Sequence, residues 1–199
     1  LPGWQHTVQL LGEKRIAEFA YRYLLKRDPD TLAWLGTNTI HRPALAGYRA
    51  LRLLMTLAPK QIQHLPDEVW KKWAPAIIAH PFSDAEGMHQ EMVALAYEAA
   101  PEETISTLMV LIDKENAQHD HIPVIRKVEC CWDKRLGEAV LEKVKDPRLK
   151  PSCMADLLTE LIKHEVPAAR AYADSLLSLP IAAEGDARAR AVAAASTLM

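Results

Sequence analysis

The chain has 199 residues, and its 24 Lys and Arg against 26 Asp and Glu give a formal net charge of −2 with neutral histidines, which excludes a uniformly basic nucleic-acid-binding protein. Because 49% of the residues are hydrophobic, the chain can bury a sizeable core and does not have the composition of a disordered segment. Only 7 glycines but 13 prolines, with few runs of β-branched residues, favour α-helices separated by proline-marked turns.

The first half of the chain contains three apolar stripes at helical spacing. Between the first and second stripes, residues 28–30 (Asp-Pro-Asp) predict a helix start with Asp28 as N-cap and Pro29 in the first helical position, and Gly36 closes this short helix. We expect Pro75 to bend or interrupt the third helix near its start. The stripes are Ile16, Phe19, Ala20, Tyr23 and Leu24; Ala46, Ala50, Leu53, Leu54 and Leu57; and Trp70, Trp73, Ala74, Ile77 and Ile78.

The second half of the chain continues the same pattern. Residues 83–86 (Ser-Asp-Ala-Glu) match a capping box at a helix start. Pro101 is expected to end that helix and to begin the next one, and residues 116–121 are expected to form a polar loop. Further apolar stripes begin after the loop at Val124, after Asp133, after the turn 146–151, at Pro167 and from Asp186 onward.

The helices group into pairs, and the first helices of the pairs start near Leu45, Ala85, Val124 and Ser152, at intervals of 40, 39 and 28 residues. Intervals near 40 with two helices per unit are typical of stacked helical hairpins, because one hairpin cannot bury its apolar face alone. The sequence therefore predicts an all-α fold, a right-handed α-α superhelix of stacked antiparallel helical hairpins. We expect a single helical-repeat domain over residues 1–199.

These hairpins resemble HEAT repeats. Residues 70–81 (WKKWAPAIIAHP) resemble the units that follow nucleoside-triphosphatase (NTPase) modules in large bacterial defence or signalling proteins. The resemblance covers residues 43–179 and is carried by periodicity and proline placement. It implies a curved scaffold whose concave wall holds a partner and relays that event to an enzymatic module. The chain has no phosphate-binding loop motif, so triphosphatase activity does not carry over.

The cysteine pattern and the chain ends indicate where the protein resides. Cys130, Cys131 and Cys153 form neither an even framework nor a C-x-x-C motif, which favours a reducing cytosol, and we expect a cytoplasmic protein. No stretch is apolar enough for a membrane span, and the first residues lack the features of a signal peptide. The chain lacks an initiator Met and shows a helical pattern up to its end, which leads us to expect a fragment of a longer polypeptide.

Two histidine-containing patterns have a metal-site interpretation and a simpler one. Residues 119–121 (His-Asp-His) could supply nitrogen and oxygen ligands to zinc, but the spacing is unusual, and vicinal cysteines on one helix point about 100° apart, so only one of Cys130 and Cys131 could join. A solvated loop is favoured. His89 and Glu91 match the H-x-E half of a zinc deaminase, but the P-C-x-x-C half is absent. The sequence therefore predicts no metal site, no cofactor and no catalytic residue.

Charge is distributed unevenly along the chain. Residues 1–80 carry a net charge of +5 and residues 81–199 a net charge of −7. A basic strip on the first two long helices could bind phosphate or an acidic partner. A solvated helix surface, with Glu18 supporting Arg22 at i,i+4, is the favoured alternative. The candidate ligand-binding residues are Arg15, Arg22, Lys26, Arg49 and Arg52.

Trp70 and Trp73, with Lys71 and Lys72 between them, could stack on nucleic-acid bases. Both tryptophans lie on an apolar stripe, however, so core packing is favoured for them.

Two main functional hypotheses follow. The leading one is a non-enzymatic helical-repeat scaffold that binds a protein or peptide, with no membrane partner, and that serves as the sensor segment of a larger signalling or defence protein. The alternative is a HEAT-like nucleic-acid-binding protein or DNA glycosylase that uses the basic N-terminal half. A regulatory repeat segment of a larger triphosphatase is a third hypothesis.

Overall fold

The computed structural model describes residues 12–81, 86–178 and 184–198, which form eleven α-helices and one 3₁₀ helix without any β-strand. The predicted all-α class is confirmed. The chain divides into two compact units, Leu1–Thr107 and Leu108–Met199, and each is described by itself. None of the helices in the described ranges combines the length and the apolar character that crossing a membrane requires.

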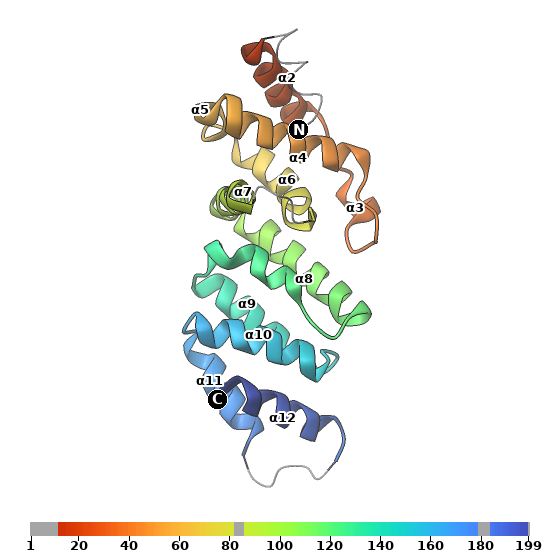
Figure 1. The fold of residues 1–199 in the computed structure, drawn as a ribbon, viewed down its shortest axis with the longest axis vertical. Helices are drawn as coiled ribbons and strands as arrows, with labels where there is room; N and C mark the ends of the chain where they lie inside the picture. The colour runs from red at the N-terminus through yellow and green to blue at the C-terminus, as the bar shows by residue number, and fades with distance from the viewer. Residues whose placement is uncertain (1–11, 82–85, 179–183, 199) are drawn as a thin grey trace. The chain divides into compact units, whose positions relative to one another are not determined.

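Unit 1 is built from helices that pack against their neighbours in the sequence (Figure 1). Helix α2 packs against α4, α4 against α6 and α6 against α7. The helices of this unit are α2 (Glu13–Lys26), α3 (Thr31–Trp34), α4 (Arg42–Leu57), α5 (Pro59–Ile62), α6 (Asp67–Ala79), α7 (Glu86–Ala99) and the first turns of α8 (Pro101–Gln118). Pro101 lies at the junction of α7 and α8, as predicted.

Trp73 is the centre of the unit 1 core. Its side chain is fully buried, and its Nε1 donates a hydrogen bond of 2.9 Å to the carbonyl oxygen of Leu24 in the last turn of α2, which supplies a partner for a carbonyl near a helix end. A Cβ atom at Gly47 would lie 1.9 Å from Cζ3 of Trp73, so α4 can approach the indole only because residue 47 has no side chain. Trp70 is buried as well. Core packing is confirmed for both tryptophans, and the base-stacking interpretation is wrong.

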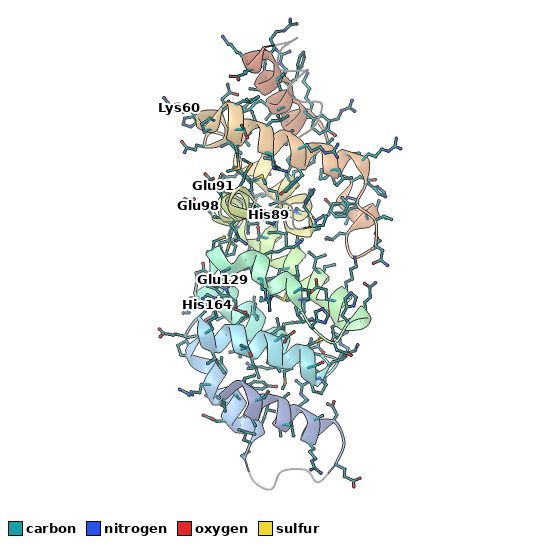
Figure 2. The ribbon with its side chains drawn as sticks, in the orientation of Figure 1. Lys60, His89, Glu91, Glu98, Glu129 and His164 are labelled. Atoms are coloured by element: carbon teal, nitrogen blue, oxygen red, sulfur yellow. The ribbon has the colours of Figure 1, made fainter. Side chains whose placement is uncertain are left out.

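Polar groups also pack inside unit 1. His89 on α7 is 1% exposed, and its Nδ1 lies 3.0 Å from the hydroxyl of Tyr48 on α4. Glu91 is exposed, and Figure 2 shows it with Glu98 on the side of α7 away from His89. Of the two residues of the H-x-E pattern, His89 therefore lies in the core of unit 1, whereas Glu91 faces solvent.

Several local predictions for unit 1 are wrong. Phe19 is 55% exposed, because the buried stripe of α2 runs through Ile16, Ala17, Ala20 and Leu24 and is rotated from the predicted one.

The helix predicted to begin at Pro29 begins at Thr31. Asp28 accepts a hydrogen bond of 2.7 Å from the backbone N–H of Asp30, which forms an Asx turn before the helix. Gly36 follows this helix with φ of 81°, in agreement with the predicted end. Helix α6 continues through Pro75, which lies in its second half.

Unit 2 contains the rest of α8 and the helices η1 (Pro123–Cys131), α9 (Lys134–Val144), α10 (Pro151–Lys163), α11 (Pro167–Leu176) and α12 (Asp186–Leu198). Helix α10 packs against α9, α11 and α12, and Leu157, Leu158 and Leu161 on α10 are fully buried. Proline occupies the first position of η1, α10 and α11, where its missing N–H costs nothing. The predicted starts after Asp133, at Pro167 and at Asp186 are confirmed.

Two predictions for unit 2 differ from the structure. Residues 116–118 belong to α8 and not to a loop. Asn116 contacts the chain after α9: its Nδ2 donates to the carbonyl of Arg148 (3.0 Å) and its Oδ1 accepts from the N–H of Lys150 (2.9 Å). The segment after Val124 is a 3₁₀ helix with non-helical dihedrals at Val128.

The capping box predicted at residues 83–86 lies largely outside the described residues, which resume at residue 86.

Candidate functional site

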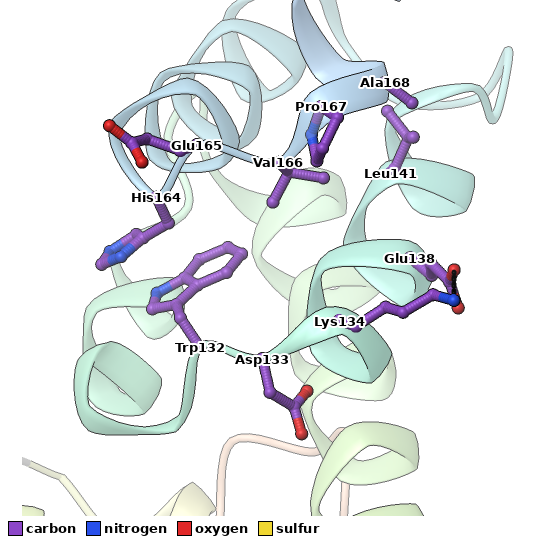
Figure 3. A pocket seen from close by; sticks show the side chains of 10 residues that line it. All are labelled: Trp132, Asp133, Lys134, Glu138, Leu141, His164, Glu165, Val166, Pro167 and Ala168. Atoms are coloured by element: carbon purple, nitrogen blue, oxygen red, sulfur yellow. Dashed lines mark ion pairs between the residues drawn. The ribbon is translucent and has the colours of Figure 1, made fainter.

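A cavity of about 590 Å³ opens in unit 2 where the chain turns from η1 into α9 and from α10 into α11 (Figure 3). Its walls are largely apolar and its rim is charged. The apolar lining comes from Trp132, Leu141, Val166, Pro167 and Ala168, and the polar lining comes from Asp133, Lys134, Glu138, His164 and Glu165. Of the four carboxylate and ammonium side chains, only Lys134 is basic, and its Nζ lies 3.8 Å from Glu138.

The turn between α10 and α11 forms one wall of this cavity. Glu165 has φ of 55°, and the N–H of Val166 donates to the carbonyl of Leu161 (2.9 Å), a pattern typical of a Schellman turn at a helix end. The turn reverses the chain and places Val166 against Gly137 of α9. Asp133 forms the opposite side of the entrance, where its carboxylate caps α9 by accepting a hydrogen bond of 2.8 Å from the N–H of Leu136.

Trp132 and His164 stack at the edge of the cavity. Their ring centroids lie 4.5 Å apart with an interplanar angle of 13°. In Figure 3 the six-membered ring of Trp132 points toward Val166, so the apolar part of the indole faces the other apolar wall. The Nε1 atom of Trp132 is buried without a hydrogen-bond partner among the described residues, which costs about 1–3 kcal/mol. Few native structures retain such a donor without a functional or structural reason.

A network of charged groups lies beside this stack. Nζ of Lys163 donates to Oε1 of Glu129 (2.8 Å) and to Oε2 of Glu160 (3.2 Å). Nε2 of His164 lies 3.3 Å from Oε2 of Glu129 and 3.7 Å from Oε2 of Glu160, and Figure 2 shows Glu129 and His164 at the same edge of unit 2. The hydrogen bond from Lys163, and then the one with His164, hold the pKa of Glu129 below its ordinary value. Glu129 is therefore a carboxylate at neutral pH.

Cys130 and Cys131 precede Trp132, and their sulfur atoms lie 3.5 Å apart. The two side chains therefore do not point apart as the sequence led us to expect, and the segment is a 3₁₀ helix with non-helical dihedrals at Val128, not the regular α-helix assumed in that expectation. Cys130 is exposed, and its hydrogen bond with the Cys131 thiol lowers the pKa of Cys130 to about 7. Cys131 is buried, and its pKa is raised by the same interaction and by burial. Cys130 thus has the more reactive thiol of the pair.

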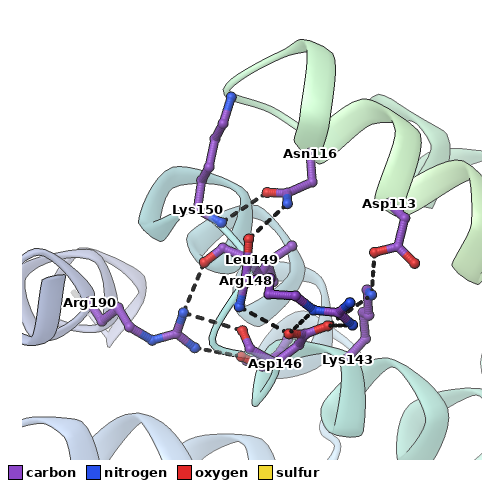
Figure 4. Close-up of polar contacts among 9 residues, drawn as sticks. Asp113, Asn116, Lys143, Asp146, Arg148, Leu149, Lys150 and Arg190 are labelled. Atoms are coloured by element: carbon purple, nitrogen blue, oxygen red, sulfur yellow. Dashed lines mark hydrogen bonds and ion pairs between the residues drawn. The ribbon is translucent and has the colours of Figure 1, made fainter.

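A second polar cluster in unit 2 has a structural role (Figure 4). The guanidinium of Arg190 on α12 is almost fully buried and donates hydrogen bonds of 2.9 Å to the carbonyls of Val144 and Leu149, which end α9 and precede α10. Asp146, in the same turn, accepts hydrogen bonds from Arg148 and Lys143, and the Arg148 hydrogen bond is the main cause of its lowered pKa. These hydrogen bonds hold the turn between α9 and α10 against α12, so we assign this cluster a structural role.

The five basic residues predicted to bind a ligand lie on α2 and α4, which pack against each other. Arg15, Arg22, Lys26 and Arg49 are exposed and Arg52 is half-buried. Arg22 forms the predicted i,i+4 ion pair with Glu18 at 2.5 Å. No hydrogen bond or ion pair between described residues joins one of the five to another. A cavity of about 530 Å³ beside α2 is lined by other residues, namely Lys14, Glu18, Tyr21, Gln61 and His64.

The His119–His121 loop is exposed, and its two imidazole rings stack with centroids 5.5 Å apart. Lys150 binds the loop through the carbonyl of His119 (2.9 Å) and through Oδ1 of Asp120 (3.1 Å). In the described part of the chain, the His and carboxylate groups that gather closely enough to share a metal ion are Glu129, Glu160 and His164.

Sequence reasoning missed the residues around Trp132 and His164. The only local signal is the i,i+4 spacing of Glu160, on α10, and His164, which follows the last residue of α10, and this spacing is common on exposed helix surfaces. Glu129 lies 35 residues before His164, so no short motif contains both.

Comparison with known proteins finds no matching protein family, no matching curated protein and no matching solved structure. Function is therefore inferred from the chemistry of these side chains.

Proposed function

We propose that this chain is a non-enzymatic helical-repeat binding module that captures a peptide segment of a partner protein, and that the cavity between Trp132 and Pro167 holds an apolar side chain of that peptide. The observation that carries the proposal is the open cavity of about 590 Å³ with apolar walls and a charged rim. This volume lies within the range typical of ligand sites, about 300–1,000 Å³. Aromatic side chains at such positions commonly supply much of the binding energy of an interface.

The charge of the rim supports a basic peptide. Asp133, Glu138 and Glu165 outnumber Lys134 at the cavity, and residues 81–199 as a whole carry a net charge of −7. This field attracts a positively charged segment and speeds its association. The preferred ligand is therefore a peptide with one aliphatic or aromatic anchor next to Lys or Arg.

The proposal includes the repeat architecture that the sequence predicts, in which antiparallel hairpins stack into a right-handed HEAT-like superhelix. It is supported within each unit by helices that pack against their neighbours in the sequence, because a repeat array is stabilised by contacts of this kind. The resemblance to arrays attached to NTPase modules further suggests that peptide capture is the sensing step of a larger signalling or defence protein.

The test is selection of peptides from a random displayed library on the full chain, followed by affinity measurement in solution. Val166→Asp places a charge in the cavity. Because residue 166 is the N-cap of α11, where Asp is favoured, the variant is expected to fold. We expect Val166→Asp to weaken binding of the selected peptides at least tenfold. Selected peptides that bind this variant as tightly as the natural chain would contradict the proposal.

The proposed preference for basic peptides is tested with two charge-reversal variants on α9. Glu138 lines the cavity, whereas Glu142 is exposed on the same helix and does not line it. Glu138→Lys and Glu142→Lys change the net charge equally. We expect only Glu138→Lys to weaken basic peptides and to reduce their association rate at low salt. Equal effects of the two variants would show that the rim does not select the ligand.

The alternative, nucleic-acid binding, is supported by the exposure of Arg15, Lys26 and Arg49, which form no ion pair with any described carboxylate. This alternative predicts that retention of duplex or single-stranded DNA falls steeply as salt rises. It also predicts that replacing Arg15, Arg22, Arg49 and Arg52 by Glu abolishes retention. Retention that persists in this variant would exclude the alternative.

A further inference from the structure

Three potential metal ligands from two segments of unit 2 meet beside the Trp132–His164 stack. Nε2 of His164 lies 3.3 Å from Oε2 of Glu129 and 3.7 Å from Oε2 of Glu160, and one ligand atom of each residue lies within 4.8 Å of the other two. Two ligands of a tetrahedral zinc ion, each at roughly 2.0–2.1 Å from the metal, lie about 3.4 Å apart. The observed spacing therefore matches a zinc site after small side-chain movements.

The fold holds these ligands before any ion binds. Glu160 and His164 lie one turn apart at the end of α10, so their side chains share a face, and η1 supplies Glu129 from the neighbouring segment. The stack on Trp132, with its interplanar angle of 13°, restricts rotation of the imidazole and keeps Nε2 directed at the carboxylates. Support of this kind around a ligand raises metal affinity. The Glu160 and His164 side chains are only 15% and 19% exposed, which limits competition from water.

Lys163 shows that the two carboxylates already favour a cation. Its ammonium bridges Glu129 and Glu160, at 2.8 Å from Oε1 of Glu129 and 3.2 Å from Oε2 of Glu160. The Lys163 side chain is 52% exposed, so it can move into water when another cation takes its place. A divalent ion would then neutralise the two carboxylates completely, whereas the lysine neutralises one charge of the two.

We propose that Glu129, Glu160 and His164 bind one divalent transition-metal ion, with Zn²⁺ as the preferred ion, in place of the Lys163 ammonium. The ligand set is one imidazole nitrogen and two carboxylate oxygens, with water completing the tetrahedron. This set suits zinc, whereas Ca²⁺ requires six to eight oxygen ligands and Mg²⁺ a near-ideal octahedron of oxygens. The ion stabilises the position of His164 at the cavity wall. The proposed metal site does not rest on the proposed peptide binding.

The test is calorimetric titration of the full chain with ZnCl₂. All proteins carry Cys130→Ser, Cys131→Ser and Cys153→Ser, so that thiolates cannot bind the metal. We expect one Zn²⁺ per chain and at least tenfold weaker binding in Glu129→Gln and in His164→Gln. Lys163→Met removes the competing ammonium and is expected to strengthen binding several-fold. Glu129 is exposed, so Glu129→Gln keeps the measurement informative even where a His164 variant fails to fold.

Two controls separate this site from others on the chain. His119→Ala with His121→Ala removes the exposed histidine pair and is expected to leave zinc binding unchanged. Titration with Co²⁺ should produce the visible absorption of a tetrahedral ion, and Glu129→Gln should abolish it. Zinc binding that survives Glu129→Gln or depends on His119 and His121 would overturn the proposal. So would zinc binding that appears only in Lys163→Met, because the lysine would then be the permanent occupant.

Discussion

Gly137 on α9 faces Val166 in the turn between α10 and α11, and a Cβ atom built on Gly137 would lie 2.9 Å from Cγ2 of Val166. A side chain at residue 137 would therefore force the Val166 side chain away from its present position. Since Val166 also lines the cavity, this contact determines how far the α10–α11 turn stands from α9, and with it the shape of the candidate site.

Gly137→Ala is the first prediction. The added methyl group forces Val166 away, at a cost of about 1–3 kcal/mol for overpacking, and the higher helix propensity of Ala returns up to about 1 kcal/mol. We expect a net loss of unfolding free energy in urea denaturation. Adding Val166→Ala removes the clash. The double variant should therefore lose less unfolding free energy than the sum of the losses in Gly137→Ala and Val166→Ala. Additive losses would mean that the two side chains do not compete for space.

The contact between Gly47 and Trp73 leads to a second prediction. The Cβ atom of Gly47→Ala would lie 1.9 Å from the indole of Trp73, which is fully buried and hydrogen-bonded to Leu24. We expect a loss of at least about 2 kcal/mol, because neither the ring nor α4 can move without breaking core contacts.

Gly87 is the matched control for Gly47. It lies on α7, and in the described part of the chain nothing outside the nearby backbone of α7 lies within 4 Å of the position that a Cβ would take there, so Gly87→Ala should stabilise the protein by about 0.5–1 kcal/mol through helix propensity. Thermal unfolding of both variants measures the difference. Equal effects of the two substitutions would show that Gly47 is not needed for the approach of Trp73.

Lys127 provides a pH-dependent prediction. It is 8% exposed, and burial lowers its pKa from 10.5 to about 8, against a smaller opposite effect of Glu115. Between pH 8 and pH 10.5 the unfolded chain therefore binds more protons at this residue than the folded chain does. Its contribution to the unfolding free energy is least favourable below pH 8 and rises with pH across this window.

Lys127→Met removes this contribution. The difference in unfolding free energy between the variant and the natural chain should shift in favour of the natural chain as pH rises through the window. Urea denaturation at several pH values measures this shift. A difference that stays constant with pH would mean that the Lys127 amine has an ordinary pKa in the folded protein.

Cys130 is expected to be the most reactive thiol. Its pKa of about 7, lowered by the Cys131 thiol, predicts that the rate of alkylation by iodoacetamide is half-maximal near pH 7. Cys131→Ser weakens the hydrogen bond and should move this midpoint upward, whereas Cys153→Ser should leave it unchanged. Peptide mapping by mass spectrometry identifies the alkylated residue. Preferential alkylation of buried Cys153 would refute the assignment.

Local signals predicted many of the helices but not their exact faces and ends. Pro101, Asp133 and Pro167 lie at helix starts because capping and the fixed φ of proline act within one turn of chain. Phe19 lies about 60° to one side of Ile16 around the helix and Ala17 about 100° to the other side, and only the packing of α2 in unit 1 decided that the side with Ala17 is buried. Residues 116–118, expected in a loop, belong to α8, and Asn116 there forms hydrogen bonds to residues more than 30 positions later, which no local pattern contains.

By itself, the amino-acid sequence determined that this chain forms amphipathic helices, because the spacing of apolar residues and the placement of proline act over one or two turns. Only the tertiary structure decided that Trp132 stacks on His164 and that Glu129 joins Glu160 beside them. These groups come from segments more than 30 residues apart, and their distances are set by the packing of α9, η1 and α10 around the turn at Glu165.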